Sequence, residues 1–124
     1  MDARLRDGIN LFNQRRFFDC HEVLEGFYHE TDEANKPFLE GLIQLAAAFR
    51  LFCDFGETRG SVRMIYQALI RFENYQPLFL DVRVLDLCQS AEAWAKSAEG
   101  AEPSASVATI PKIQVRRSGF FRSL

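Results

Sequence analysis

The segment from Lys36 to Phe55 constrains the fold more than any other part of the sequence. On a helical wheel at 100° per residue, apolar or small side chains surround it on almost every side. A helix of this kind is buried on several sides, so it predicts an all-α protein with this helix at the centre of a bundle. Pro37 suits its first turn, and Gly56 suits a left-handed cap at its end.

Four further helices are predicted around this central helix, because apolar residues recur at helical spacing. They cover approximately residues 2–14, 17–31, 58–75 and 81–98. Asp2 and Asp81 are expected to cap the first and the last of them. With 124 residues and 48% apolar side chains, the chain can bury one core. The predicted fold class is therefore a single-domain bundle of about five helices, followed by an irregular basic tail.

The character of the sequence changes after Glu99. A stretch containing Gly, Pro and Ser follows, which is typical of a linker. Residues 1–102 carry 11 basic and 17 acidic side chains, whereas residues 103–124 carry four basic and no acidic ones. We therefore divide the chain into a helical bundle, residues 1–99, and a linker with a basic tail, residues 100–124.

The apolar residues of this tail leave its placement open. Residues 110–116 alternate apolar and polar side chains, and Phe120 and Phe121 follow near the end. The tail is either frayed or docked on its own bundle or that of a neighbouring copy. Docking on a second copy would make the tail a dimer contact.

Composition excludes several partners and compartments. The formal net charge of −2 gives no basic field, so we expect no nucleic-acid partner. The longest apolar-rich run, Leu42–Phe55, is too short and polar to span a membrane. The three cysteines are odd in number and form no C-x-x-C motif, which favours reduced thiols and a cytoplasmic location. No signal peptide is visible at the N-terminus.

His21 and Glu25 are the first residues that could carry chemistry. They lie four apart, so their side chains share one helix face. Such a pair can hold a divalent metal only with one or two further ligands, for which Glu40 and His29 are the candidates. We expect no metal and no cofactor. The remaining alternatives are a structural ion pair and a general base, with Glu25 orienting His21.

Gln44 lies on the predicted central helix among small residues. Gly41, Ala47 and Ala48 stand three or four positions away, so a neighbouring backbone can approach closely. A long amide there needs partners, since an unsatisfied buried group costs about 1–3 kcal/mol. Because the preceding helix packs beside this one, His21 or Glu25 is the expected partner.

Two stretches of the chain together resemble a known family. Leu11–Glu25 contains Phe-Asn ahead of a His-Glu-x-x-Glu helix, and Phe38–Ala48 contains Gly-Leu-Ile-Gln-x-Ala-Ala. Both motifs are similar to those of the domain-of-unknown-function 309 family, whose members are small all-helical proteins. The resemblance covers roughly residues 5–75. The positions that match are His21, Glu22, Glu25, Gly41, Gln44 and Ala47.

The chain departs from the family pattern at two places. Tyr28 stands where the family usually has Trp, and Gly60-Ser61 stands where it commonly has Gly-Ala. The resemblance implies the helical fold and a shared polar cluster. It implies no activity, because the family is named for having none assigned.

The function remains unknown at this point, and two hypotheses of different classes are open. The first is a structural or binding and scaffold module, with a homodimer as the candidate association. The second is a metal-assisted or general-base hydrolase that uses the polar cluster. A cleft with room for substrate would favour the enzyme, and a dry, filled network would favour the module. The predicted cluster consists of His21, Glu22, Glu25, Tyr28 and Gln44.

Overall fold

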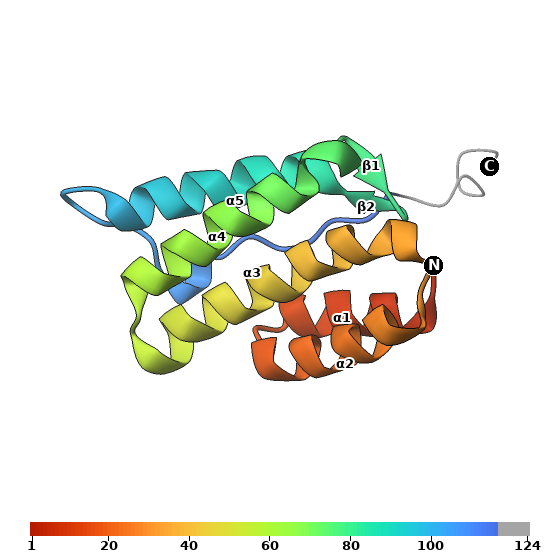
Figure 1. Ribbon diagram of the computed structural model, residues 1–124. Coiled ribbons are helices and arrows are strands. Elements are labelled where there is room, and N and C mark those ends of the chain that lie inside the picture. The colour runs from red at the N-terminus through yellow and green to blue at the C-terminus, as the bar shows by residue number, and fades with distance from the viewer. Residues whose placement is uncertain (117–124) are drawn as a thin grey trace, which may run out of the picture.

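The computed structural model of the protein describes residues 1–116. Within this range the chain forms five α-helices and one short β-hairpin (Figure 1). In chain order these elements are α1 (Ala3–Asn13), α2 (Phe17–Glu30), α3 (Lys36–Phe55), α4 (Thr58–Phe72), β1 (Leu78–Phe79), β2 (Val82–Arg83) and α5 (Val84–Glu99). Single turns of 3-10 helix cover Glu33–Asn35, Glu73–Tyr75 and Val107–Thr109.

The long helix α3 lies at the centre of the bundle, as its sequence predicts. It packs against α2 on one side and α4 on the other, while α1 packs on α2 and α5 on α4 (Figure 1). Leu39, Leu42 and Phe49 of α3 are fully buried. The all-α fold class is therefore confirmed.

Two helix ends have the capping residues that the sequence predicts. The Asp2 side chain accepts a hydrogen bond of 2.8 Å from the backbone N–H of Arg4, which caps α1. Gly56 ends α3 with φ of +65°, a left-handed conformation that glycine adopts without steric cost. Its N–H donates to the carbonyl of Phe52 at 3.2 Å.

The expected start of the last helix at Asp81 is wrong. Asp81 belongs to the turn of the β-hairpin, in which Leu78 pairs with Arg83 and Phe79 with Val82. Leu80 and Asp81 both have positive φ, 48° and 66°, as the two central residues of a tight hairpin turn require. The helix α5 begins only at Val84.

The chain after α5 turns back along the bundle (Figure 1). We call residues 103–116 the C-terminal segment. Ile110 and Ile113 are each only 3% exposed and belong to the core. Val115 bridges to Val82, which joins the segment to the hairpin. Over the described residues the tail is therefore docked on its own bundle, whereas Phe120 and Phe121 lie outside them.

Polar contacts fix the register of the C-terminal segment. The Asn13 side chain donates to the carbonyl of Ile113 at 3.0 Å and accepts from its N–H at 2.7 Å. Arg15 donates to the carbonyl of Ile110 at 2.6 Å, and the Trp94 indole N–H donates to that of Ser106 at 3.2 Å. These bonds tie α1 and α5 together through the segment.

Candidate functional site

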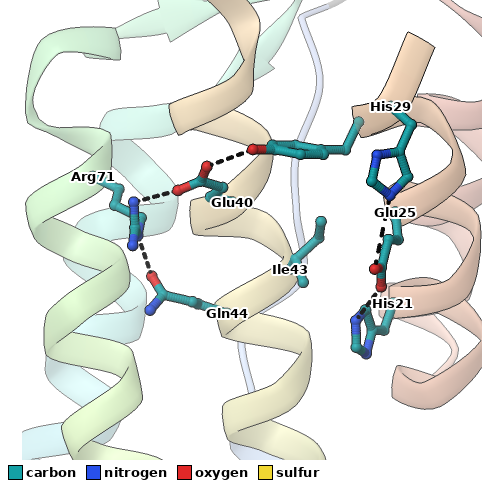
Figure 2. Close-up of a pocket in the computed structure, with 8 residues that line it drawn as sticks. His21, Glu25, His29, Glu40, Ile43, Gln44 and Arg71 are labelled. Carbon is teal, nitrogen blue, oxygen red and sulfur yellow. Dashed lines mark hydrogen bonds and ion pairs between the residues drawn. The ribbon is translucent and has the colours of Figure 1, made fainter. Parts of the chain in front are cut away.

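A cleft of about 250 Å³ opens between α2, α3 and α4 (Figure 2). Polar side chains form two walls of this cleft, and the side chain of Ile43 lies between them. We call this feature the cleft throughout. Its lining residues are His21, Glu25, Tyr28, His29, Glu40, Ile43, Gln44 and Arg71.

The first wall is a ladder of side chains on α2. His21 Nε2 lies 2.8 Å from Glu25 Oε2, and His29 Nε2 lies 4.0 Å from Glu25 Oε1. The three residues are spaced four apart, so one helix face presents all of them. Buried Cys20 and Leu24 on the other face of α2 fix the orientation of this ladder. The side chains remain accessible, at 35% for His21 and 52% for Glu25.

The second wall joins all three helices through Glu40 of α3. The Tyr28 hydroxyl of α2 donates to Glu40 Oε1 at 2.8 Å, and Arg71 of α4 pairs with Glu40 Oε2. Arg71 Nε also donates to Gln44 Oε1 at 2.8 Å. The hydrogen bond to the Glu40 carboxylate raises the pKa of Tyr28, because the neutral phenol is the form that donates.

Gln44 lines the cleft, but its expected hydrogen-bond partners are wrong. Its side chain bonds Arg71 and, at 3.3 Å through Nε2, Gln67 of α4, rather than His21 or Glu25. Ile43 lies between Gln44 and the α2 ladder, and Gln44 points toward Arg71 (Figure 2). The amide finds its partners on the following helix instead of the preceding one.

The close contact at Gly41 comes from a side chain, the Phe72 ring of α4, rather than from a neighbouring backbone as expected. A Cβ added to Gly41 would lie 2.6 Å from Cε1 of Phe72. This contact brings α4 near enough to α3 for Arg71, the neighbour of Phe72, to reach Glu40 and Gln44. Glycine at position 41 therefore shapes the second wall.

Sequence reasoning placed some cleft residues and missed others. His21, Glu25, Tyr28 and Gln44 line the cleft, whereas Glu22 is exposed and does not. Arg71 was not expected there, because nothing in the sequence gives the crossing of α3 and α4. Glu40 and His29, which the sequence offered only as candidate metal ligands beside His21 and Glu25, also line the cleft.

The donor groups limit which chemistry the described residues support. Over residues 1–116, no group of three or more His, Cys, Asp or Glu side chains is placed to hold a metal ion. Glu40, considered as a metal ligand, is engaged by Tyr28 and Arg71 instead. Within the same range, no helix combines the length and hydropathy needed to cross a bilayer.

All three thiols are free and lie outside the cleft lining. Burial raises the pKa of Cys20 to about 12, so this thiol stays protonated at neutral pH. Burial also raises the pKa of Cys53 and of Cys88. The cleft therefore offers the His21–Glu25 pair and an arginine, but no sulfur nucleophile.

A family model matches the first part of the chain, which supplies most of the cleft residues. Residues 5–64 match the model of a family described as a domain of unknown function, DUF309. This part of the chain is similar to DUF309. This match confirms the family that the sequence resembles, and it includes every cleft residue except Arg71. No curated protein matches the chain.

Proposed function

We propose that this protein is a binding module whose cleft holds a small, carboxylate-bearing ligand. The observation that carries the proposal is an open space of about 250 Å³ between charged side chains that their neighbours already hold in place. A small organic acid fits such a volume, whereas a folded partner does not enter it.

The hydrogen-bonding capacity left in the cleft favours an anionic ligand. Both oxygens of Glu40 are engaged, one by Tyr28 and one by Arg71, and both oxygens of Glu25 face a histidine. The remaining donor capacity lies on Arg71, because a guanidinium has five N–H groups and only two of its nitrogens are engaged by Glu40 and Gln44. A carboxylate accepts from such donors, and Ile43 offers contact to the carbon skeleton.

A purely structural role accounts for this cluster less well. The charged side chains of the cleft are between 35% and 68% exposed. Exposed ion pairs contribute only about 0–1 kcal/mol each to the free energy of unfolding. Such pairs hold side chains in position without adding much stability, which is what a preorganised binding site requires.

The test is a titration followed by ¹H–¹⁵N NMR spectra, with sodium succinate and sodium acetate as probes and sodium chloride at equal ionic strength as reference. We expect saturable shifts of amides around the cleft on α2, α3 and α4. Arg71→Gln removes the guanidinium, so the affinity should fall at least about tenfold, the loss of a charge-assisted hydrogen bond.

The matched control is Arg63→Gln, which removes an exposed arginine of the same helix outside the cleft. Its affinity for succinate should equal that of the unchanged protein. Shifts that scale linearly with salt, or that respond equally to the two arginine variants, would contradict the proposal.

One observation favours a second candidate, a general-base hydrolase. The Glu25 carboxylate lies 2.8 Å from His21, which can leave the other imidazole nitrogen to take a proton from water. Hydrolysis of p-nitrophenyl acetate by the unchanged protein, by His21→Ala and by His29→Ala tests this candidate. Loss of rate with His21→Ala alone supports it, and equal rates in all three reject it. A metal-assisted version has less support, because the described residues offer no metal-ligand set.

We also infer a cytoplasmic protein that associates as a homodimer. The three free thiols support the reducing compartment. Exposed Phe18 and Phe55 support association, since they flank the Arg50 guanidinium at 4.6 and 5.5 Å and form an uncovered aromatic surface. Light scattering on the unchanged protein and on Phe55→Ser tests the dimer. A monomer mass for the unchanged protein would reject it.

A further inference from the structure

A second hollowed surface lies between α4 and α5, outside the cleft. Two adjoining hollows of about 370 and 340 Å³ share Leu85 as a lining residue. The first is bordered by Ile70 of α4, and the second by Leu78 of β1. We call the two hollows together the α4–α5 groove.

The floor of the α4–α5 groove is apolar and uncovered. Ile70 is 67% exposed, and Leu78 and Leu85 are each 37% exposed. A continuous exposed apolar surface of this kind marks a place where another segment binds. The first hollow has an acidic rim, formed by Glu73 and Glu92, whereas Asp86 at the second hollow has Arg83 and Arg116 beside it.

The chain itself leads into this groove. Arg116, the last described residue, lines the second hollow, and its side chain pairs with Asp81 at 2.6 Å. Its backbone N–H donates to the carbonyl of the same aspartate at 2.7 Å. The remaining eight residues therefore start from a point fixed at the edge of the groove.

The composition of these eight residues complements the groove. Residues 117–124 contain three large apolar side chains, two arginines and no acidic residue; these are Phe120, Phe121, Leu124, Arg117 and Arg122. The apolar side chains suit the floor, and the arginines suit the acidic rim of the first hollow. Ser118-Gly119 is a turn signal that allows the chain to change direction after Arg117.

The length also suits the groove. Eight extended residues reach about 26 Å at about 3.3 Å per residue. The groove follows α5 from Leu85 to Glu92, a rise of about 10 Å at 1.5 Å per residue. The segment can therefore reverse direction and still cover the groove.

We propose that residues 117–124 bind in the α4–α5 groove of their own chain. Phe120 and Phe121 cover Ile70 and Leu85, and an arginine of the segment pairs with Glu73 or Glu92 at the first hollow. The C-terminal segment then continues from the α1–α5 seam to the outer face of α4 and α5. This proposal does not depend on the function of the cleft.

The experiment compares methyl NMR spectra of the full chain with those of the full chain carrying Phe120→Ser and Phe121→Ser. We expect nuclear Overhauser contacts from the two rings to the methyl groups of Ile70 and Leu85 in the unchanged protein. Both methyl signals should lose their ring-current shifts in the variant. Val107, 45% exposed and outside the groove, serves as the internal reference and should not move.

Two further measurements make the result decisive. Ile70→Ser changes an exposed side chain, so we expect the fold to be retained. The variant removes an apolar contact that holds the two rings in the groove, so the nuclear Overhauser contacts between the rings and Leu85 should weaken. Phe18→Ser, a change of the same kind at a surface on α2, should leave the groove signals unchanged.

The proposal would be overturned if the methyl signals of Ile70 and Leu85 did not change when both phenylalanine rings are removed. Ring contacts that weaken on dilution together with a dimer mass would overturn it as well. In that case the segment binds the groove of a second copy instead of its own.

Discussion

The cleft and the C-terminal segment both join helices, but they do so with opposite kinds of contact. In the cleft, charged side chains from three helices meet while a third or more of each remains exposed to water. In the C-terminal segment, Ile110 and Ile113 are 3% exposed, and backbone groups make most of the polar bonds.

This difference has an energetic consequence. A buried isoleucine truncated to alanine costs about 2–5 kcal/mol, whereas an exposed ion pair contributes about 0–1 kcal/mol. We therefore expect the stability of the bundle to depend on the C-terminal segment and hardly at all on the cleft. Side chains of the cleft can then be selected for binding with little penalty to the fold.

The largest effect is expected from Ile113→Ala. It removes a core side chain and leaves a cavity between α1 and the C-terminal segment, so the free energy of unfolding should fall by about 2–5 kcal/mol. Denaturant melts followed by circular dichroism measure the change. Val115→Ala, at a position 43% exposed in the same segment, is the control and should cost much less.

The same variant tests the division of the chain at Glu99. If residues 1–99 form a bundle that is stable by itself, Ile113→Ala will release the C-terminal segment and leave the main melting transition in place. If the core depends on Ile113, the whole transition will move to lower denaturant concentration. The position of Ile113 in the core leads us to expect the second result.

The next largest effect is expected from Gly41→Leu, which tests how closely α3 and α4 pack behind the cleft. The new side chain would collide with the Phe72 ring, whose Cε1 lies 2.6 Å from the site of an added Cβ, so we expect a loss of about 1–3 kcal/mol. Gly26→Leu is the matched control, because nothing lies within 4 Å of an added Cβ there. It should stabilise α2 by about 0.5–1 kcal/mol through helix propensity.

Ala47→Leu should have a smaller effect than Gly41→Leu, because Ala47 is half-buried. Thermal melts of these variants rank the contacts along α3. Equal midpoints for Gly41→Leu and Gly26→Leu would show that α4 does not approach α3 closely at Gly41.

Much of the fold could be predicted because it depends on local periodicity. The all-round apolar wheel of residues 36–55 predicts a central helix, and Asp2 and Gly56 act as caps where the sequence places them. The hairpin before α5 could not be predicted in the same way. Its turn places Leu80 at φ of 48°, a conformation that leucine seldom adopts and that tertiary contacts must impose.

The same distinction applies to the candidate site, where contacts within one helix could be predicted and contacts between helices could not. His21 and Glu25 were found because both stand on one helix, where spacing alone gives proximity. The pairing of Gln44 was missed because it depends on Arg71, a residue of another helix 27 positions later. Contacts between helices follow from crossing geometry, which the periodicity of a single sequence does not contain.

A small effect on stability is expected from Glu40→Gln in the second wall of the cleft. The amide keeps the shape of the side chain but weakens its bonds to Tyr28 and Arg71. Because both partners reach solvent, the free energy of unfolding should fall by about 1 kcal/mol or less. Chemical denaturation measures it, and a loss near that of Ile113→Ala would contradict the contrast between the two regions.

The smallest effect concerns the pH dependence of Tyr28. Its pKa is raised above the usual 10.0, first because the phenol donates to Glu40, and second because of burial. The native state therefore holds this proton more tightly than the unfolded chain does. The resulting stabilisation is complete below pH 10 and is lost as pH rises through the raised pKa.

Tyr28→Phe lacks this contribution, so the difference in melting temperature between the unchanged protein and this variant should shrink between pH 9 and pH 11. In the background of Glu40→Gln the same comparison should show a smaller pH dependence, because the carboxylate that retains the proton is gone and only the weaker effect of burial remains. A difference that stays constant across this range in both backgrounds would show that the hydrogen bond between Tyr28 and Glu40 does not form in solution, and the second wall of the cleft would then lose its link to α2.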